Sequence, residues 1–205
     1  MENWERIIKW LEKNAPSIKE AIQPPASQEL IEKVQSLVGL ELPDDFKRLY
    51  ATSNGISPDA RANLFFGMTF IPLERVCEHL EAINSRDSDF YLIHADRGIK
   101  SEYRLSTSRI PFADDFGTSL LCIDLNPDEN GTLGQVVFID YNMDTGLLLA
   151  SSITELVQQF AEALEAGKYQ LLEEAKTDGV EWLDPERSID PVNWYNSPTW
   201  SYVES

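Results

Sequence analysis

Residues 110–141 of the chain read IPFADDFGTSLLCIDLNPDENGTLGQVVFIDY, in which a string of carboxylates accompanies two apolar segments and no basic residue intervenes. Segments 120–125 and 135–141 are rich in β-branched, aromatic and leucine residues, and the connection 126–134 is dense in Asn, Asp, Pro and Gly. This pattern predicts a β-hairpin. Because the hairpin would display negative charge, it suits the binding of a basic partner better than catalysis.

Further elements follow the hairpin and complete a predicted meander. The turn-forming sequence NMDT at 142–145 leads to a strand at 146–150, and three strands with short connections pair antiparallel. Ser152 and Glu155 have the spacing of a capping box, and apolar residues between 153 and 164 recur at helical spacing. We therefore expect a closing helix that ends at Gly167.

The N-terminal half is predicted to be mainly helical. Apolar residues recur at helical spacing in segments 4–11, 18–22, 30–38, 43–55 and 73–84. Short apolar stretches at 63–71 and 90–93 predict strands, while 96–108 reads as a polar loop. The expected fold is α+β, with an antiparallel β-sheet meander flanked by helices at the N-terminus and by a closing C-terminal helix.

The charge of the chain is strongly uneven. The formal charge is -18 over 205 residues, and residues 110–205 contain 18 acidic and 3 basic side chains, which gives -15. Such a field repels nucleic-acid phosphates and anionic lipid but speeds encounter with basic proteins. Solubility alone can account for an acidic protein, but the clustering favours a basic partner over nucleic acid or membrane.

Cysteine content and hydropathy give a consistent expectation about the compartment. Cys77 and Cys122 lie in apolar contexts and predict buried thiols, with neither a disulfide nor a metal clip. The first residues, MENWERIIKWLEK, are too charged for a signal peptide, and no apolar run is long enough to span a bilayer. A cytoplasmic protein is expected.

Several motifs in fixed order resemble one known family. LPDDFK at 42–47, followed by NG at 54–55, is similar to the LP-x-D-[YF]-K…NG helix of the SMI1/KNR4 family, also called the SUKH superfamily. PFADDFG at 111–117, LCIDL at 121–125 and GQVVFID at 134–140 resemble the core of that family, and 153–164 resembles its last helix. Ile110 stands where many relatives have Trp.

The resemblance covers roughly residues 27–166 and implies an SMI1/KNR4-like (SUKH-like) domain over residues 1–176. Residues 177–205 form an extension outside the family pattern, with three prolines and three tryptophans. The extension is either an arm docked through Trp182, Trp194 and Trp200 or a partly ordered tail, and so many aromatic residues favour docking.

The resemblance implies a non-catalytic protein-binding module. Bacterial members are associated with toxin loci, where many are immunity proteins that neutralise a cognate toxin, often a nuclease. Fungal relatives regulate cell-wall synthesis and signalling and bind several proteins. The immunity role is the first expectation, and an intracellular scaffold or regulator is the alternative. A carboxylate-dependent hydrolase is the third.

Binding would place carboxylates against Lys and Arg side chains of the partner. Phe116 and Tyr141 are candidate apolar anchors, and each is equally compatible with a core position. The candidate partner-binding residues are Asp114, Asp115, Phe116, Asp124, Asp128, Glu129, Asp140, Tyr141 and Asp144.

Possible chemical sites are weaker. His94 and Asp96 would share one face of a strand as an acid/base pair or the start of a metal site, but no third ligand follows, so a structural role is favoured. Residues 124–131 resemble the start of an EF-hand loop. However, Glu129 occupies the position of the loop glycine and Gln135 that of the closing Glu, so a hairpin turn is favoured.

The pair Asp114 and Asp115 is the basis of the hydrolase alternative, although adjacent carboxylates more often solvate a loop. The sequence contains no nucleophile elbow, phosphate loop or dinucleotide fingerprint. We therefore predict no catalytic residue, no cofactor and no metal.

Overall fold

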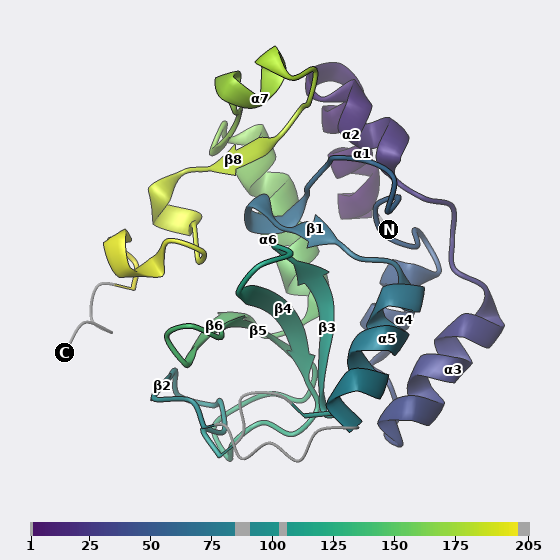
Figure 1. The fold of residues 1–205 in the computed structure, drawn as a ribbon, viewed down its shortest axis with the longest axis vertical. Helices are drawn as coiled ribbons and strands as arrows, with labels where there is room; N and C mark the ends of the chain where they lie inside the picture. Colours follow the sequence, from purple (N-terminus) through teal and green to yellow (C-terminus); the bar gives the residue numbers. More distant parts are fainter. Residues whose placement is uncertain (1, 85–90, 103–105, 201–205) are drawn as a thin grey trace.

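The computed structural model describes residues 2–84, 91–102 and 106–200. A mixed sheet with strand order β1-β3-β4-β5-β6-β2 lies at its centre (Figure 1). Along the chain, helices both precede and follow the central strands β3–β6. The strands are β1 (Thr69–Phe70), β2 (His94–Ala95), β3 (Arg109–Asp114), β4 (Ser119–Asp124), β5 (Gln135–Asp140) and β6 (Thr145–Ala150). The α+β prediction is confirmed.

The predicted hairpin is present as β4 and β5, which pair antiparallel with Leu121 opposite Phe138. β6 follows as predicted and pairs antiparallel with β5. Strand β3 was not expected. It contains Pro111, which cannot donate to a strand ladder. It is accommodated by a register shift between Pro111 and Ala113, and β3 pairs antiparallel with both β4 and β1.

Two other strands differ from the prediction. Segment 63–71 forms the short 3₁₀ turn η1 (Phe65–Gly67) and the two-residue β1. The strand expected at 90–93 begins instead at His94, and residue 90 lies outside the described residues. β2 pairs parallel with β6, so the sheet is mixed and not a pure antiparallel meander.

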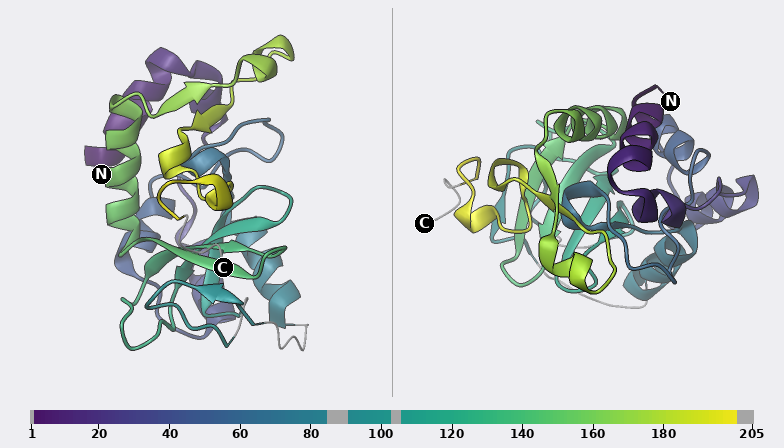
Figure 2. Two further views of the ribbon diagram at one scale, coloured as in Figure 1. Left: turned by 90° about the vertical axis from the view of Figure 1, so that its left-hand side faces the viewer. Right: turned by 90° about the horizontal axis from the view of Figure 1, so that it is seen from above.

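The helices are α1 (Glu2–Asn14), α2 (Pro16–Ala21), α3 (Gln28–Val38), α4 (Asp44–Tyr50), α5 (Leu73–Asn84), α6 (Ile153–Glu165) and α7 (Glu173–Thr177). Ser152 Oγ accepts from Glu155 N, so the predicted cap of α6 is confirmed, and Ser27 Oγ accepts from Leu30 N at the start of α3 in the same way. Helix α1 packs along α6 (Figure 2). Arg6 of α1 and Glu165 of α6 form an ion pair at 2.6 Å. No helix among the described residues has the length and apolarity of a membrane span.

The two faces of the sheet are covered differently. Leu121, Ile123 and Phe138 point to the main core, which the helices complete. On the opposite face Leu120, Cys122, Val137 and Ile139 form a smaller cluster with Leu92 and Ile99 of segment 91–102. Gly146 permits this close cover, because a Cβ there would lie 2.8 Å from Leu92 Cδ1.

The described part of the C-terminal extension, residues 177–200, is docked on the domain. β7 (Tyr169–Leu171) pairs with β8 (Leu183–Pro185), so one hairpin contains residues on both sides of position 176. The Asn63 side chain exchanges two hydrogen bonds of 2.8 Å with the backbone of Leu183. Trp194 and Trp200 are buried in the main core, while Trp182 is half-buried.

Replacing Trp194 by Ala is expected to lower the free energy of unfolding by about 3–5 kcal/mol, as for other buried aromatic residues. The indole also donates to Asp140 Oδ2 at 3.1 Å, and this bond would be lost. Urea denaturation followed by circular dichroism measures the change. The neighbouring Tyr195 is 45% exposed, so Tyr195→Ala is the matched control. An equally stable domain after removal of residues 177–205 would contradict this role for the extension.

Candidate functional site

The structure separates the nine predicted binding residues into two groups at opposite ends of the sheet. Those near the β3–β4 and β5–β6 turns are Asp114, Asp115, Phe116, Asp140, Tyr141 and Asp144, and those near the β4–β5 connection are Asp124, Asp128 and Glu129. The strands between them have six residues each, so the groups are about 20 Å apart. They do not form one acidic surface.

Three of the predicted surface carboxylates are in fact buried. Asp114, Asp124 and Asp140 are 6%, 0% and 7% exposed. Each is the last residue of its strand, and its carboxylate accepts a hydrogen bond from the backbone N–H two residues later, which is an Asx turn. The pairs are Asp114 with Phe116, Asp124 with Asn126 at 3.0 Å, and Asp140 with Asn142 at 2.9 Å. These carboxylates hold the turns in place.

The β3–β4 turn is fixed by two consecutive aspartates. Asp115 Oδ1 accepts from Gly117 N at 2.8 Å and from Ser119 N at 2.9 Å. The second oxygen of Asp114 lies 3.2 Å from His79 Nε2 on α5. Between these contacts Phe116 has a left-handed φ of 56° and is 66% exposed. That conformation costs a residue with a side chain about 1–2 kcal/mol.

The β5–β6 turn lies beside the first, because Tyr141 N donates to Thr118 O at 2.8 Å. Tyr141 itself is half-buried against the smaller cluster. Asp140 joins this turn to the extension, since its Oδ1 also accepts from Met143 N at 3.0 Å and its Oδ2 from the Trp194 indole. Asp144 is half-buried, and its carbonyl accepts from Ile93 N at 2.7 Å.

Four exposed apolar side chains lie on these two turns or on segments hydrogen-bonded to the β5–β6 turn. Phe116, Ile93, Met143 and Tyr195 are 66%, 73%, 51% and 45% exposed. We call this set of four residues the apolar turn end. Apolar side chains in this number at one end of a domain are typical of an interaction surface.

The opposite end of the sheet contains a buried ion pair that the sequence reasoning missed. Arg109 and Asp124 are both fully buried and face one another across the β3–β4 ladder, with 3.8 Å between Nε and Oδ2. Gln135 Nε2 donates to Gly98 O at 2.8 Å and to Asp124 Oδ2 at 3.3 Å. Asp124 therefore points inward, and Gln135, from which it accepts, fastens segment 91–102. Asp128 and Glu129 are exposed.

Asp96, one member of the predicted His94–Asp96 pair, has a structural role. Asp96 Oδ2 accepts from Leu148 N at 2.8 Å, so it caps the edge of β6 beside the two-residue β2. Within residues 2–84, 91–102 and 106–200, no three His, Cys, Asp or Glu side chains are grouped to hold a metal ion.

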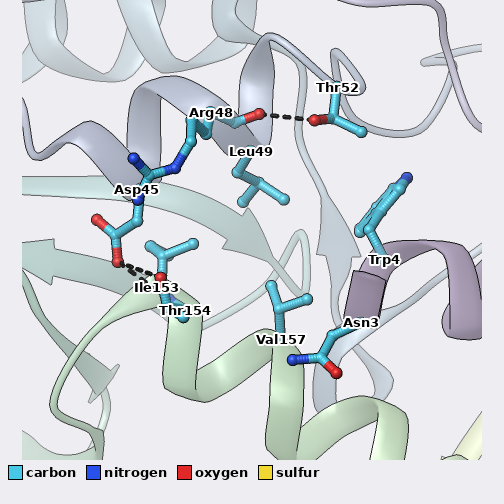
Figure 3. Close-up of a pocket in the computed structure, with 9 residues that line it drawn as sticks. All are labelled: Asn3, Trp4, Asp45, Arg48, Leu49, Thr52, Ile153, Thr154 and Val157. Carbon is cyan, nitrogen blue, oxygen red and sulfur yellow. Dashed lines mark hydrogen bonds between the residues drawn. The ribbon is translucent and has the colours of Figure 1, made fainter. Parts of the chain in front are cut away.

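A small pocket of about 80 Å³ lies between α1, α4 and α6 (Figure 3). Trp4, Leu49 and Val157 form apolar walls, while the side chain of Asp45 accepts from Thr154 N at 3.0 Å. Asp45 belongs to the LPDDFK motif, and its position explains the motif as a tie between α4 and the start of α6. None of the predicted binding residues lines this pocket.

Both thiols are in environments that oppose nucleophilic chemistry. Cys77 and Cys122 are free and buried, as predicted. Burial raises the pKa of each thiol above its ordinary value, more strongly for Cys122, whose thiol is surrounded by the apolar cluster between the sheet and segment 91–102. The reactive thiolate is consequently scarce at neutral pH.

These features define an α+β domain in which a helix-covered sheet presents an apolar turn end beside carboxylate-capped loops. The family model of the SMI1 / KNR4 family (SUKH-1) matches residues 25–159. The chain belongs to this family, as its motifs predicted.

Curated relatives are fungal. The chain is 23% identical to "KNR4/SMI1 homolog 2" of Debaryomyces hansenii, over 91% of this chain and 39% of the relative. It is 24% identical to "Cell wall biosynthesis/cell cycle regulator smi1" of Schizosaccharomyces pombe, over 82% and 36%. It is 21% identical to "Cell wall assembly regulator SMI1" of Saccharomyces cerevisiae, over 94% and 46%. The chain thus spans less than half of the length of these relatives.

Buried and exposed aspartates are expected to respond differently to truncation. Asp114→Ala removes the acceptor of a turn N–H and the partner of His79, so it should lower the free energy of unfolding by about 1–3 kcal/mol. Asp128→Ala at an exposed position should stay within about 0.5 kcal/mol of wild type. Chemical denaturation of both variants measures the difference. Equal losses would contradict the structural role of Asp114.

The thiols give a second check. In the native protein Cys77 and Cys122 should react slowly with an aromatic disulfide reagent, because burial raises their pKa and blocks access. Both should react at once in denaturant. Rapid reaction of one thiol equivalent in the folded protein would show that a cysteine is reachable and activated.

Proposed function

We propose that this chain is a non-catalytic domain that binds a basic protein, and that this partner is a cognate toxin which the domain neutralises. The observation that carries the proposal is the apolar turn end on a chain whose residues 110–205 have a formal charge of -15. Exposed aromatic and aliphatic side chains combined with a single sign of charge are characteristic of a surface that selects a partner of opposite charge.

The role of the carboxylates supports binding over hydrolysis. Both Asp114 and Asp115 accept backbone N–H groups of their own turn, and His79 lies against Asp114. A general acid or base must be free to exchange a proton with a substrate. These two side chains are instead occupied in holding the loop, which weakens the alternative of a carboxylate-dependent hydrolase.

Electrostatics would act on the rate of association and the apolar contacts on the lifetime of the complex. An acidic field accelerates the approach of a basic protein, and this acceleration falls as salt screens the charges. Buried apolar contacts slow dissociation and are insensitive to salt by comparison. A toxin that uses Lys and Arg to hold phosphate would be neutralised when those side chains meet carboxylates.

A second candidate is a regulator that binds several proteins. It is favoured by the relatives, two of which are named as regulators of cell-wall synthesis or assembly and are matched over 82% and 94% of this chain. Because more than half of each relative lies outside the match, the regulatory activity can belong to parts that this chain does not contain.

Affinity capture with the tagged domain from its native cell tests the proposal. At low salt one dominant basic protein should be retained, and high salt should release it, because screening removes the attraction between opposite charges. Mass spectrometry identifies the protein. Several unrelated partners would favour the regulator, and capture of no basic protein would contradict the proposal.

Co-expression separates the two candidates. If a gene immediately upstream encodes the captured protein, its expression alone should arrest growth, and the domain should restore it. Growth that is unaffected by the upstream gene product would exclude the immunity role for that pair.

A further inference from the structure

We infer that Phe116 is the anchor through which this domain holds its partner, and that the partner offers an apolar socket bordered by Lys or Arg. This inference rests on the proposed binding of a basic protein. It adds which end of the sheet is the interface and which side chain determines the lifetime of the complex.

The backbone of Phe116 is unusual for its position. With φ at 56° it adopts the left-handed conformation that Gly, Asn and Asp adopt readily and that an aromatic residue rarely does. Gly117, the next residue, would tolerate a positive φ without a steric penalty, yet Phe116 is the left-handed residue of this turn. A strained conformation that persists at an exposed aromatic residue indicates selection for the direction of the side chain.

The surrounding carboxylates hold Phe116 in this conformation. Asp114 accepts from Phe116 N, and Asp115 accepts from Gly117 N and Ser119 N, so hydrogen bonds fix the backbone on both sides of the ring. The contact with His79 on α5 connects Asp114 to a helix. A turn whose backbone is already fixed loses little backbone entropy on binding, which is a property of strong anchors.

The neighbourhood of Phe116 defines the chemistry of the partner. Met143 lies on the adjoining β5–β6 turn, and Ile93 and Tyr195 lie on segments that are hydrogen-bonded to that turn. Asp115 and Asp144, next to Phe116 and Met143 in the chain, are half-buried. Basic residues within 110–205 are confined to Lys168, Lys176 and Arg187, and none of them lies on the two turns. Complementarity therefore requires a basic border around an apolar socket.

The other end of the sheet provides a matched comparison. Leu133, in the β4–β5 connection, is also 66% exposed and lies near the carboxylates of Asp128 and Glu129. Its backbone is not left-handed. The two positions thus share exposure and an acidic setting but differ in the backbone conformation that we associate with function.

The experiment places the photoreactive amino acid benzoylphenylalanine at position 116 or at position 133 of the full chain in its native cell. Irradiation should cross-link position 116, and not position 133, to the same basic protein that high salt releases from the wild-type domain. That protein, once purified, is the probe for dissociation kinetics with Phe116→Ala and Leu133→Ala.

Phe116→Ala should increase the dissociation rate by about 30-fold or more, as for a hot-spot residue, while Leu133→Ala should change it less than about twofold. Both variants should keep the wild-type melting temperature, since both side chains are largely exposed. A bound partner with unchanged dissociation from Phe116→Ala, or cross-linking at position 133 alone, would overturn the anchor and leave the proposed function standing. If the wild-type domain captures no basic protein, both fail.

Discussion

The structure depends on aspartates that end strands and satisfy the backbone of the turns that follow. Asp114, Asp124 and Asp140 close β3, β4 and β5, and in each case the carboxylate accepts the N–H group two residues later. Because the three aspartates are buried, their carboxylates need such hydrogen-bond partners. The same three side chains also contact His79, Arg109 and Trp194, so they join the sheet to a helix, to a neighbouring strand and to the C-terminal extension.

Local patterns were sufficient to predict much of the fold. The hairpin β4–β5, strand β6 and helices α3 and α6 follow from periodicity and capping residues that act over a few positions. β3 was missed. It contains Pro111, which has no N–H to donate, and the register shift next to that residue accommodates it in the ladder. The direction of β2 was missed because it depends on how segment 91–102 folds back over the sheet, which no local pattern records.

The burial of individual aspartates could not be predicted for a related reason. Asp114 and Asp128 look alike in sequence, yet Asp114 is buried and Asp128 is exposed. The difference arises because α5 packs against Asp114, whereas Asp128 lies in a loop that faces solvent. A signal was available, since an Asp at the end of an apolar strand that precedes a turn is a common Asx-turn position. The pairing of Arg109 with Asp124 could be recognised only once the register of β3 and β4 was known.

The capped turn around Phe116 has a consequence for how members of such a family diverge. Its conformation is set by the carboxylates of Asp114 and Asp115, which precede the tip, and not by contacts of the exposed ring. Evolution can therefore exchange the tip residue while the sheet beneath stays intact. In a lineage whose partners change, substitutions at position 116 can alter which partner is recognised while the fold is kept.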